Sequence, residues 1–218
     1  MNNRPVLLSV SLAFLTCGLF LVGTSKVSGT HESATPNSAL KLTTSILNKK
    51  LCVGDGEVST LQMRLQLHYS NTGQRPIILY KGSSVVASAT VSKTAADALA
   101  GRNELTLSTT ILTAGRQEMN ETQRFDSSFA MLPKGSSFNT ISEVSVPFAI
   151  SDQSVPRGVI KSGWHVLQIQ TITWPESAEL AEKLGNRWKR RGYLWHDLAH
   201  SEPMPFKIQQ EVRLENCR

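Results

Sequence analysis

Alternation of apolar and polar residues is the strongest pattern in this chain. It is clearest over residues 61–69 (LQMRLQLHY), where every second residue is apolar. Successive side chains of a β-strand point to opposite faces, so this period of two predicts a strand with one buried face. The turn-forming residues Asn71, Thr72 and Gly73 follow it and are expected to end the strand.

Short apolar or alternating segments with turn residues between them predict further strands. They cover residues 42–47, 76–80, 85–92, 105–112, 144–150, 163–174 and 206–214. Pro147 places one of these strands at a sheet edge or a bulge, because proline cannot donate to a central ladder. About eight mostly consecutive strands without regular helices between them predict an all-β, antiparallel sandwich. We assign residues 39–218 to this single domain.

Residues 176–191 depart from the strand pattern and predict a helical insertion before the last strand. Three apolar residues recur there at helical spacing, namely Leu180, Leu184 and Trp188. Thr173 and Glu176 have the spacing of a capping box, and Gly192 suits a helix end. Gly185 in the interior costs roughly 1 kcal/mol of helix stability, so we expect the helix to be short or bent.

The first 29 residues have the anatomy of a secretory signal rather than of a folded element. Arg4 precedes an apolar run of 17 residues, 6–22, and small residues follow at 27–29. That length is at the lower limit for a membrane-spanning helix, so an uncleaved anchor is the alternative. Residues 30–38 are polar and predict a linker. We therefore expect an exported protein, periplasmic, secreted or at the cell surface, that touches a membrane only through this segment if it is uncleaved.

Cysteine content agrees with export. Once residues 1–29 are removed, only Cys52 and Cys217 remain, 165 positions apart. Two cysteines in an oxidising compartment favour one disulfide, which would hold the C-terminal end of the domain in place. The alternatives are a metal site or a catalytic thiol, but the close spacing of zinc motifs is missing.

The positive charge of the chain is concentrated in one place. The whole sequence has 23 Lys and Arg against 17 Asp and Glu, a net charge of +6, and two of these bases lie in the predicted leader. The remaining excess of four equals the number of bases in one short run. That run is the candidate surface for an anionic partner: Arg187, Trp188, Lys189, Arg190 and Arg191. The alternative is that these cations only complement the dipole at the end of the helix. The modest net charge predicts no specific nucleic-acid recognition.

Two histidines have a spacing that is typical of zinc ligands on a helix. His196 and His200 are four residues apart and would share one face of a helix, as in zinc hydrolases. Asp197 stands where such a motif needs glutamate, and no histidine follows His200. We therefore expect loop residues here and no catalytic, metal or cofactor site, with a zinc-dependent hydrolase as the alternative. Asn120 begins a glycosylation sequon in a polar stretch that predicts an exposed loop.

Several turns resemble those of bacterial exported immunoglobulin-like β-sandwich proteins. They are an Asn-x-Gly-x-x-Pro turn within residues 69–76, a Leu-Pro-x-Gly turn at 132–135, a Gly-x-His-x-Leu strand within 162–167, and residues 201–208. The resemblance covers residues 40–217 and implies an immunoglobulin-like sandwich without cofactors. It also implies a binding or structural module, not an enzyme, that recognises an unknown protein or cell-envelope ligand through loops or an edge strand. A narrower likeness is to the sandwich-type proteinase inhibitors of bacteria.

Overall fold

The computed structural model of the protein describes residues 39–54, 58–81, 86–109, 119–151, 155–174, 176–209 and 217. All of them belong to the compact unit Ala34–Arg218. The predicted leader and linker lie outside the described residues, so the signal peptide stays a prediction. Within the described ranges, no helix is both long and apolar enough to cross a membrane.

The prediction of a mostly β, antiparallel fold is confirmed. The first sheet has the order β1 (Leu40–Cys52), β2 (Val58–Asn71) and β7 (Ser137–Ala149), all antiparallel. The alternation over residues 61–69 is confirmed as well, since its five apolar side chains are buried: Leu61, Met63, Leu65, Leu67 and Tyr69. β7 lies at the end of the sheet order, which agrees with the edge position expected from Pro147.

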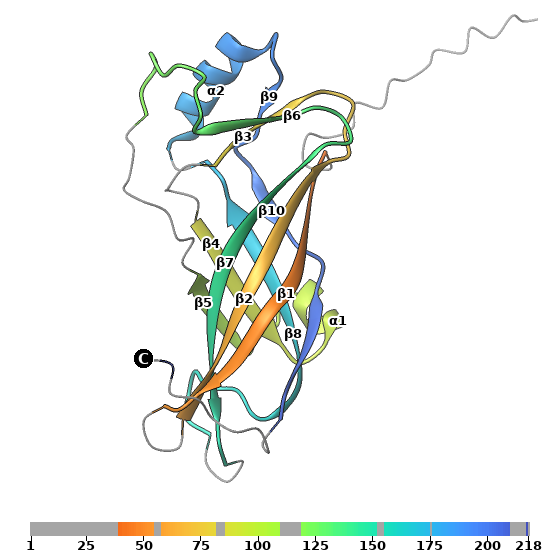
Figure 1. Ribbon diagram of the computed structural model, residues 1–218, viewed down its shortest axis with the longest axis vertical. Coiled ribbons are helices and arrows are strands. Elements are labelled where there is room, and N and C mark those ends of the chain that lie inside the picture. Colours follow the sequence, from red (N-terminus) through yellow and green to blue (C-terminus); the bar gives the residue numbers. More distant parts are fainter. Residues whose placement is uncertain are drawn as a thin grey trace, which may run out of the picture. The chain divides into compact units, whose positions relative to one another are not determined.

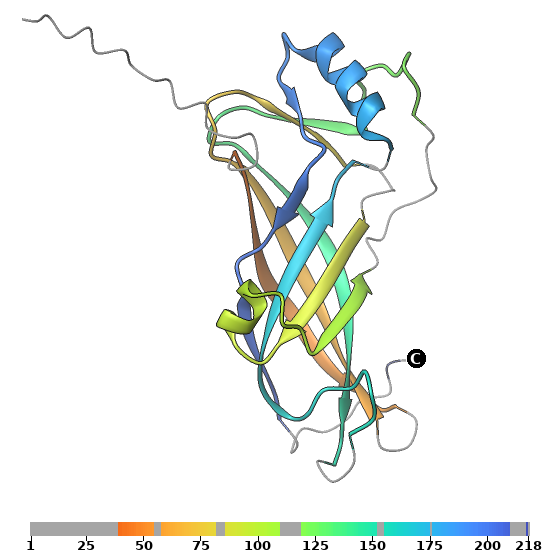
Figure 2. The same ribbon diagram turned by 180° about the vertical axis from the view of Figure 1, so that it is seen from behind.

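The second sheet runs β10 (Leu198–His200), β8 (Gly163–Ile172), β4 (Val86–Ser92) and β5 (Leu105–Thr109), and β11 (Met204–Ile208) also pairs with β8. Figure 1 shows β4, β5 and β8 as a layer behind β1, β2 and β7, and Figure 2, from the opposite side, shows the same layer in front. The inward side chains of both sheets form one continuous core. Leu65, Val146, Val91 and Ile169 come from four different strands and are all fully buried.

A third small sheet was not expected from the sequence. It has the order β6 (Phe129–Leu132), β3 (Ile77–Tyr80) and β9 (Tyr193–Leu194), and β9 runs parallel to β3. Helix α2 (Ala178–Trp188) packs on this sheet, and Figure 1 shows both at one end of the two larger sheets. β3 is buried on both faces: Ile77 and Leu79 point into the main core, whereas Ile78 and Tyr80 point into a second core beneath α2.

The helical insertion is confirmed, but its predicted start is wrong. The N-cap is Ser177, whose hydroxyl accepts a hydrogen bond of 3.2 Å from the Leu180 N–H, and not Thr173. Gly192 follows the helix for a different reason from the one expected. A Cβ atom there would lie 2.6 Å from the Pro76 carbonyl oxygen, because β9 approaches the start of β3 closely. The insertion also does not directly precede the last strand, since β9 and β10 intervene.

The boundaries of several strands differ from the predicted ones. The strand expected over residues 144–150 is only the second half of β7. Residues 110–112 and 210–214, predicted as strand ends, lie outside the described residues. The short helix α1 (Ala95–Leu99), which is capped by the Thr94 side chain, was not predicted from the sequence.

Candidate functional site

The predicted disulfide between Cys52 and Cys217 is present. Its sulfur atoms are 2.03 Å apart and the two Cα atoms 5.4 Å apart. Cys52 is the last residue of β1 and is buried, whereas Cys217 is the second-last residue of the chain. The bond therefore ties the C-terminal end to the first strand of the domain and serves a structural purpose.

The two histidines do not share a helical face. His200 lies in strand β10, and His196 lies in the preceding loop, where its Nδ1 atom is 3.2 Å from the Leu194 carbonyl oxygen. The i, i+4 argument for zinc holds only on a helix. Across the described residues, no three His, Cys, Asp or Glu side chains gather as a metal site would require.

The predicted glycosylation sequon is exposed. The Asn120 side-chain oxygen accepts hydrogen bonds from the backbone N–H of Thr122, at 2.9 Å, and from the Thr122 hydroxyl, at 2.6 Å. The described residues that follow it are mostly exposed, as the sequence predicts, but Met119 just before it is buried in the second core.

The predicted cationic surface at the end of α2 divides into two groups. Trp188 does not belong to a contact surface at all, because it is only 5% exposed and packs edge-on against Phe129 in the second core. Arg187 donates a hydrogen bond of 2.6 Å to the Glu121 carbonyl, and Arg191 stacks 5.0 Å above the Phe125 ring. These residues hold the segment around residue 121 against the helix.

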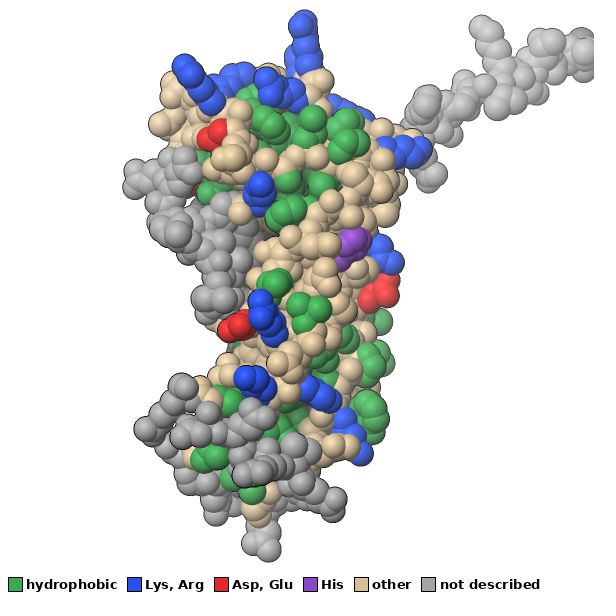
Figure 3. Space-filling view, in the orientation of Figure 1, with side chains coloured by type: hydrophobic (Ala, Val, Ile, Leu, Met, Phe, Trp, Pro, Cys, Tyr) green, Lys and Arg blue, Asp and Glu red, His purple; other side chains and the backbone are tan. Residues whose placement is uncertain are grey.

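Lys189 and Arg190 form the second group. Both are exposed, and neither makes an ion pair with any residue that the structure describes. Figure 3 shows Lys and Arg side chains gathered at the end of the molecule where α2 lies. Of the four cations among the five residues predicted for an anionic partner, these two are the ones whose side chains make no hydrogen bond, ion pair or ring contact with the residues that the structure describes.

A cavity of 430 Å³ lies beside these cations, between α2, β9 and the residues that precede β3. Its polar lining is Arg75, Glu182, Asn186, Lys189, Tyr193 and His196. Of these, the sequence singled out Lys189 for an anionic partner and His196 as a zinc ligand in the alternative hydrolase interpretation. Arg75 was noticed solely as part of a turn, and nothing in the sequence pattern places it next to a helix more than a hundred residues later.

The electrostatics of the cavity favour a negatively charged group. Arg75 and Lys189 contribute two positive charges against the single carboxylate of Glu182. Burial, together with the smaller effect of the negative charge of Asp197, raises the pKa of the Tyr193 hydroxyl to about 12. Tyr193 is therefore protonated at neutral pH, and its hydroxyl donates a hydrogen bond of 3.3 Å to the Asp197 carboxylate.

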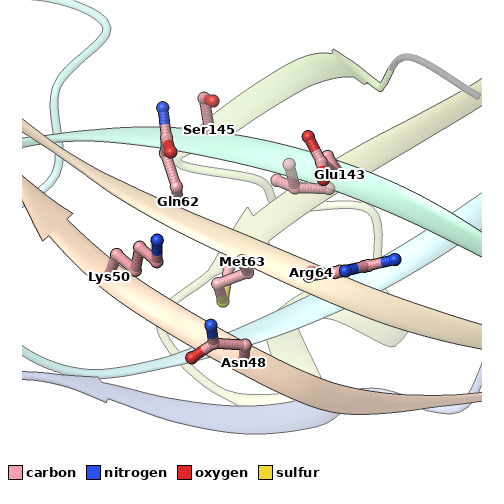
Figure 4. A pocket seen from close by; sticks show the side chains of 8 residues that line it. Asn48, Lys50, Gln62, Met63, Arg64, Glu143 and Ser145 are labelled. Atoms are coloured by element: carbon pink, nitrogen blue, oxygen red, sulfur yellow. The ribbon is translucent and has the colours of Figure 1, made fainter. Parts of the chain in front are cut away.

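A second, smaller cavity of 210 Å³ lies on the outer face of the first sheet (Figure 4). Its walls come from two cross-strand rows, in which Arg64 is opposite Glu143 and Gln62 is opposite Lys50 and Ser145. Its volume is below the roughly 300–1,000 Å³ typical of small-molecule sites, and its charges are of both signs. The cavity beside α2 is therefore the stronger candidate for ligand binding.

Comparison with known proteins adds no further guidance to function. The chain matches no protein-family model, and no curated protein matches it significantly.

Proposed function

We propose that this chain is an exported, non-enzymatic binding domain that recognises an anionic partner through the exposed cationic end of α2. The observation that carries this proposal is the division of the cations. Lys183, Arg187 and Arg191 have partners within the fold, whereas Lys189 and Arg190 are directed to solvent beside a cavity that Arg75 also lines. Exposed like charges on a fixed support attract an oppositely charged partner.

The rigidity of the support strengthens the proposal. Leu184 and Trp188 anchor α2 in the second core, next to the rings of Phe129 and Phe125. Lys183 makes ion pairs with Glu121, at 2.6 Å, and with Glu179, at 2.8 Å. A helix held in this way keeps the backbone of Lys189 and Arg190 in a fixed position, so binding of a partner has to order only their side chains.

Export and the immunoglobulin-like relationship are part of the same proposal. The disulfide supports an oxidising compartment, since such bonds persist outside the cytosol. The facing of two antiparallel sheets across one core, with the turns at residues 71–76 and 132–135 in contact, supports an immunoglobulin-like arrangement. Recognition by side chains at one end of the sheets is the usual way in which such domains bind.

The burial of the apolar face of α2 argues for a polar anionic partner over a lipid bilayer. Helices that bind membranes insert apolar side chains below the headgroups. Here Ala181, Leu184 and Trp188 are all buried within the protein, so α2 has none of these side chains left to insert. We therefore favour an acidic polymer of the cell envelope or its surroundings.

A binding assay with matched charge variants tests the proposal. The protein is passed over immobilised polygalacturonate, with neutral dextran as the blank and phosphatidylglycerol vesicles as a separate arm. We expect retention on the polyanion that falls as salt is added, and a loss of at least about tenfold in affinity for Lys189→Glu/Arg190→Glu. Lys93→Glu/Lys161→Glu makes the same change in net charge on exposed residues elsewhere.

The control pair decides whether position or total charge matters. Equal losses in the two double variants would show that only net charge is sensed, and would overturn the proposed surface. Absence of any retention of the unmodified protein would overturn the proposed function. Binding to the vesicles but not to the polymer would replace the polymer by a membrane as the partner.

A further inference from the structure

Gly185 lies in the interior of α2, where glycine lowers helix stability relative to alanine and where the local structure does not require it. Its backbone does not have a positive φ, and a Cβ atom there would meet only the Leu194 Cβ, at the ordinary contact distance of 3.8 Å. Neither backbone conformation nor close packing therefore requires glycine. Gly185 does line the cavity beside α2, and a larger side chain at this position would occupy part of that cavity.

We infer that this cavity binds an acidic sugar, a polyhydroxylated ring that carries a carboxylate. The inference rests on the proposed function and makes it more specific, because it assigns one acidic unit of the partner to one pocket. The volume of 430 Å³ is within the range of small-molecule sites and is large enough for a single sugar ring.

The two cations of the lining account for the carboxylate. Arg75 and Lys189 both line the cavity and come from distant parts of the chain, since Arg75 directly precedes Pro76 and Lys189 lies at the end of α2. A guanidinium group binds a carboxylate through two parallel hydrogen bonds, and an ammonium group adds a point charge. His196 also lines the cavity. Its Nδ1 atom contacts the Leu194 carbonyl, which leaves Nε2 for another partner.

The remaining polar groups account for the sugar hydroxyls. Glu182 lines the same cavity and would repel a bare inorganic anion, but its carboxylate accepts hydrogen bonds from hydroxyl groups. The Asn186 amide both donates and accepts. Tyr193 is half-buried and supplies an aromatic surface beside these groups. A ligand with one negative charge and several hydroxyls satisfies this set, whereas phosphate alone does not.

The helix end does not oppose such a ligand strongly. The C-terminus of a helix carries partial negative charge, which disfavours anions. In α2 the Trp188 carbonyl already accepts hydrogen bonds from the N–H groups of Arg191, at 2.7 Å, and Gly192, at 3.3 Å. Lys189 follows directly and compensates the remaining partial charge.

Titration with monomeric probes tests the inference. Galacturonate, galactose and inorganic phosphate are added separately to the isotope-labelled protein, and backbone amide shifts are followed by NMR. We expect saturable shifts at residues 185–196 with galacturonate, at a dissociation constant of about 1 mM, and at least tenfold weaker binding of the other two probes. Equal affinity for phosphate would overturn the assignment to a sugar, and no saturable galacturonate binding would overturn the site.

Substitution of Gly185 provides the sharpest variants. Gly185→Gln fills the cavity with a good helix former and should weaken galacturonate binding at least tenfold without lowering the melting temperature. Gly185→Ala adds one methyl group and should raise the melting temperature by about 2–4 °C with a smaller effect on binding. Arg75→Gln should weaken binding of galacturonate but not of galactose.

The outcomes separate this inference from the proposed function. If Gly185→Gln keeps full galacturonate affinity, the cavity is not the site, and the inference fails. Polygalacturonate retention that still depends on Lys189 and Arg190 would leave the proposed function intact in that case. If the unmodified protein binds neither monomer nor polymer, both fail together.

Discussion

The side-chain amide of Asn71 donates a hydrogen bond of 2.8 Å to the backbone carbonyl of Leu132. Asn71 ends β2, and Leu132 ends β6, so the bond joins the turn before β3 to the turn before β7. The same amide donates to the Arg75 carbonyl at 2.8 Å, and its oxygen accepts from the Gly73 N–H at 2.9 Å. One buried side chain therefore holds together two of the connections between the large sheets and the small sheet, the β2–β3 turn and the β6–β7 turn.

Replacement of Asn71 should destabilise the protein substantially. Asn71→Ala removes three hydrogen bonds and leaves the buried Leu132 carbonyl without that donor, so we expect a loss of about 2–4 kcal/mol in the free energy of unfolding. Urea denaturation measures it. The neighbouring Ser70→Ala, which removes only an exposed hydrogen bond, should change stability by less than about 0.5 kcal/mol. A loss below 1 kcal/mol for Asn71→Ala would contradict this role.

Removal of the disulfide should also be costly. The bond closes a loop of 165 residues, for which the chain-entropy account gives about 5 kcal/mol, and measured losses are typically 2–5 kcal/mol. We expect Cys52→Ser/Cys217→Ser to lose about that amount. Reduction of the unmodified protein should reproduce the loss, whereas reduction of the double variant should have no effect. Equal stability of the oxidised protein and the double variant would show that the bond contributes nothing.

Tyr69 should make the protein sensitive to alkali. Burial, partly offset by the adjacent Thr171 hydroxyl, raises the pKa of its phenol to about 12. The unfolded chain loses this proton near pH 10, whereas the folded protein keeps it. The contribution is thus complete below pH 10 and disappears as the pH rises to 12, a loss of about 2–3 kcal/mol.

Tyr69→Phe provides the comparison for this effect. It removes the titrating hydroxyl but keeps the buried ring, which is 1% exposed in the main core. Urea denaturation at pH 7, 9, 10 and 11 should show a smaller alkaline loss in the variant than in the unmodified protein. Identical pH dependence in both proteins would contradict the assignment to Tyr69.

Substitution of Trp188 should lower the stability of the protein far more than substitution of Arg190, although both residues belong to the predicted cationic surface. Trp188 is buried against Phe125 and Phe129, so Trp188→Ala should cost about 3–5 kcal/mol through the cavity that it creates. Arg190 is exposed, and Arg190→Ala should stay within about 0.5 kcal/mol of the unmodified protein. Thermal and urea denaturation of the two variants measure this difference. Similar losses in both would contradict the division of the surface.

Much of the strand content could be predicted because burial on one face leaves a period of two in the sequence. β2 shows this clearly, from Leu61 to Tyr69. β3 shows where this kind of prediction fails. All four residues of the strand are buried, since alternate side chains enter two different cores. Such a strand has no alternation to reveal that a second core exists. β9 has only two residues, too few for any pattern.

The candidate site was predictable only in part for a related reason. The density of basic residues at 187–191 predicts a cationic surface, but it does not show which of these cations have partners within the folded protein. Arg187 and Arg191 are held by the Glu121 carbonyl and the Phe125 ring, both more than sixty residues earlier in the chain. Arg75 reaches the cavity only because β3 and β9 lie side by side. These relationships depend on contacts between distant segments, which local patterns do not record.

Local physical chemistry thus made the β-rich class, the helix over α2 and the Cys52–Cys217 pair readable from the amino-acid sequence. Each depends on periodicity, helix spacing or a count of cysteines, which are properties of the chain before it folds. The tertiary structure alone decided that Trp188 is a core residue, that Lys189 and Arg190 are the available cations, and that Gly185 opens a cavity. Burial and charge pairing are set by neighbours in space, and the chain acquires those neighbours only when its sheets close around their cores.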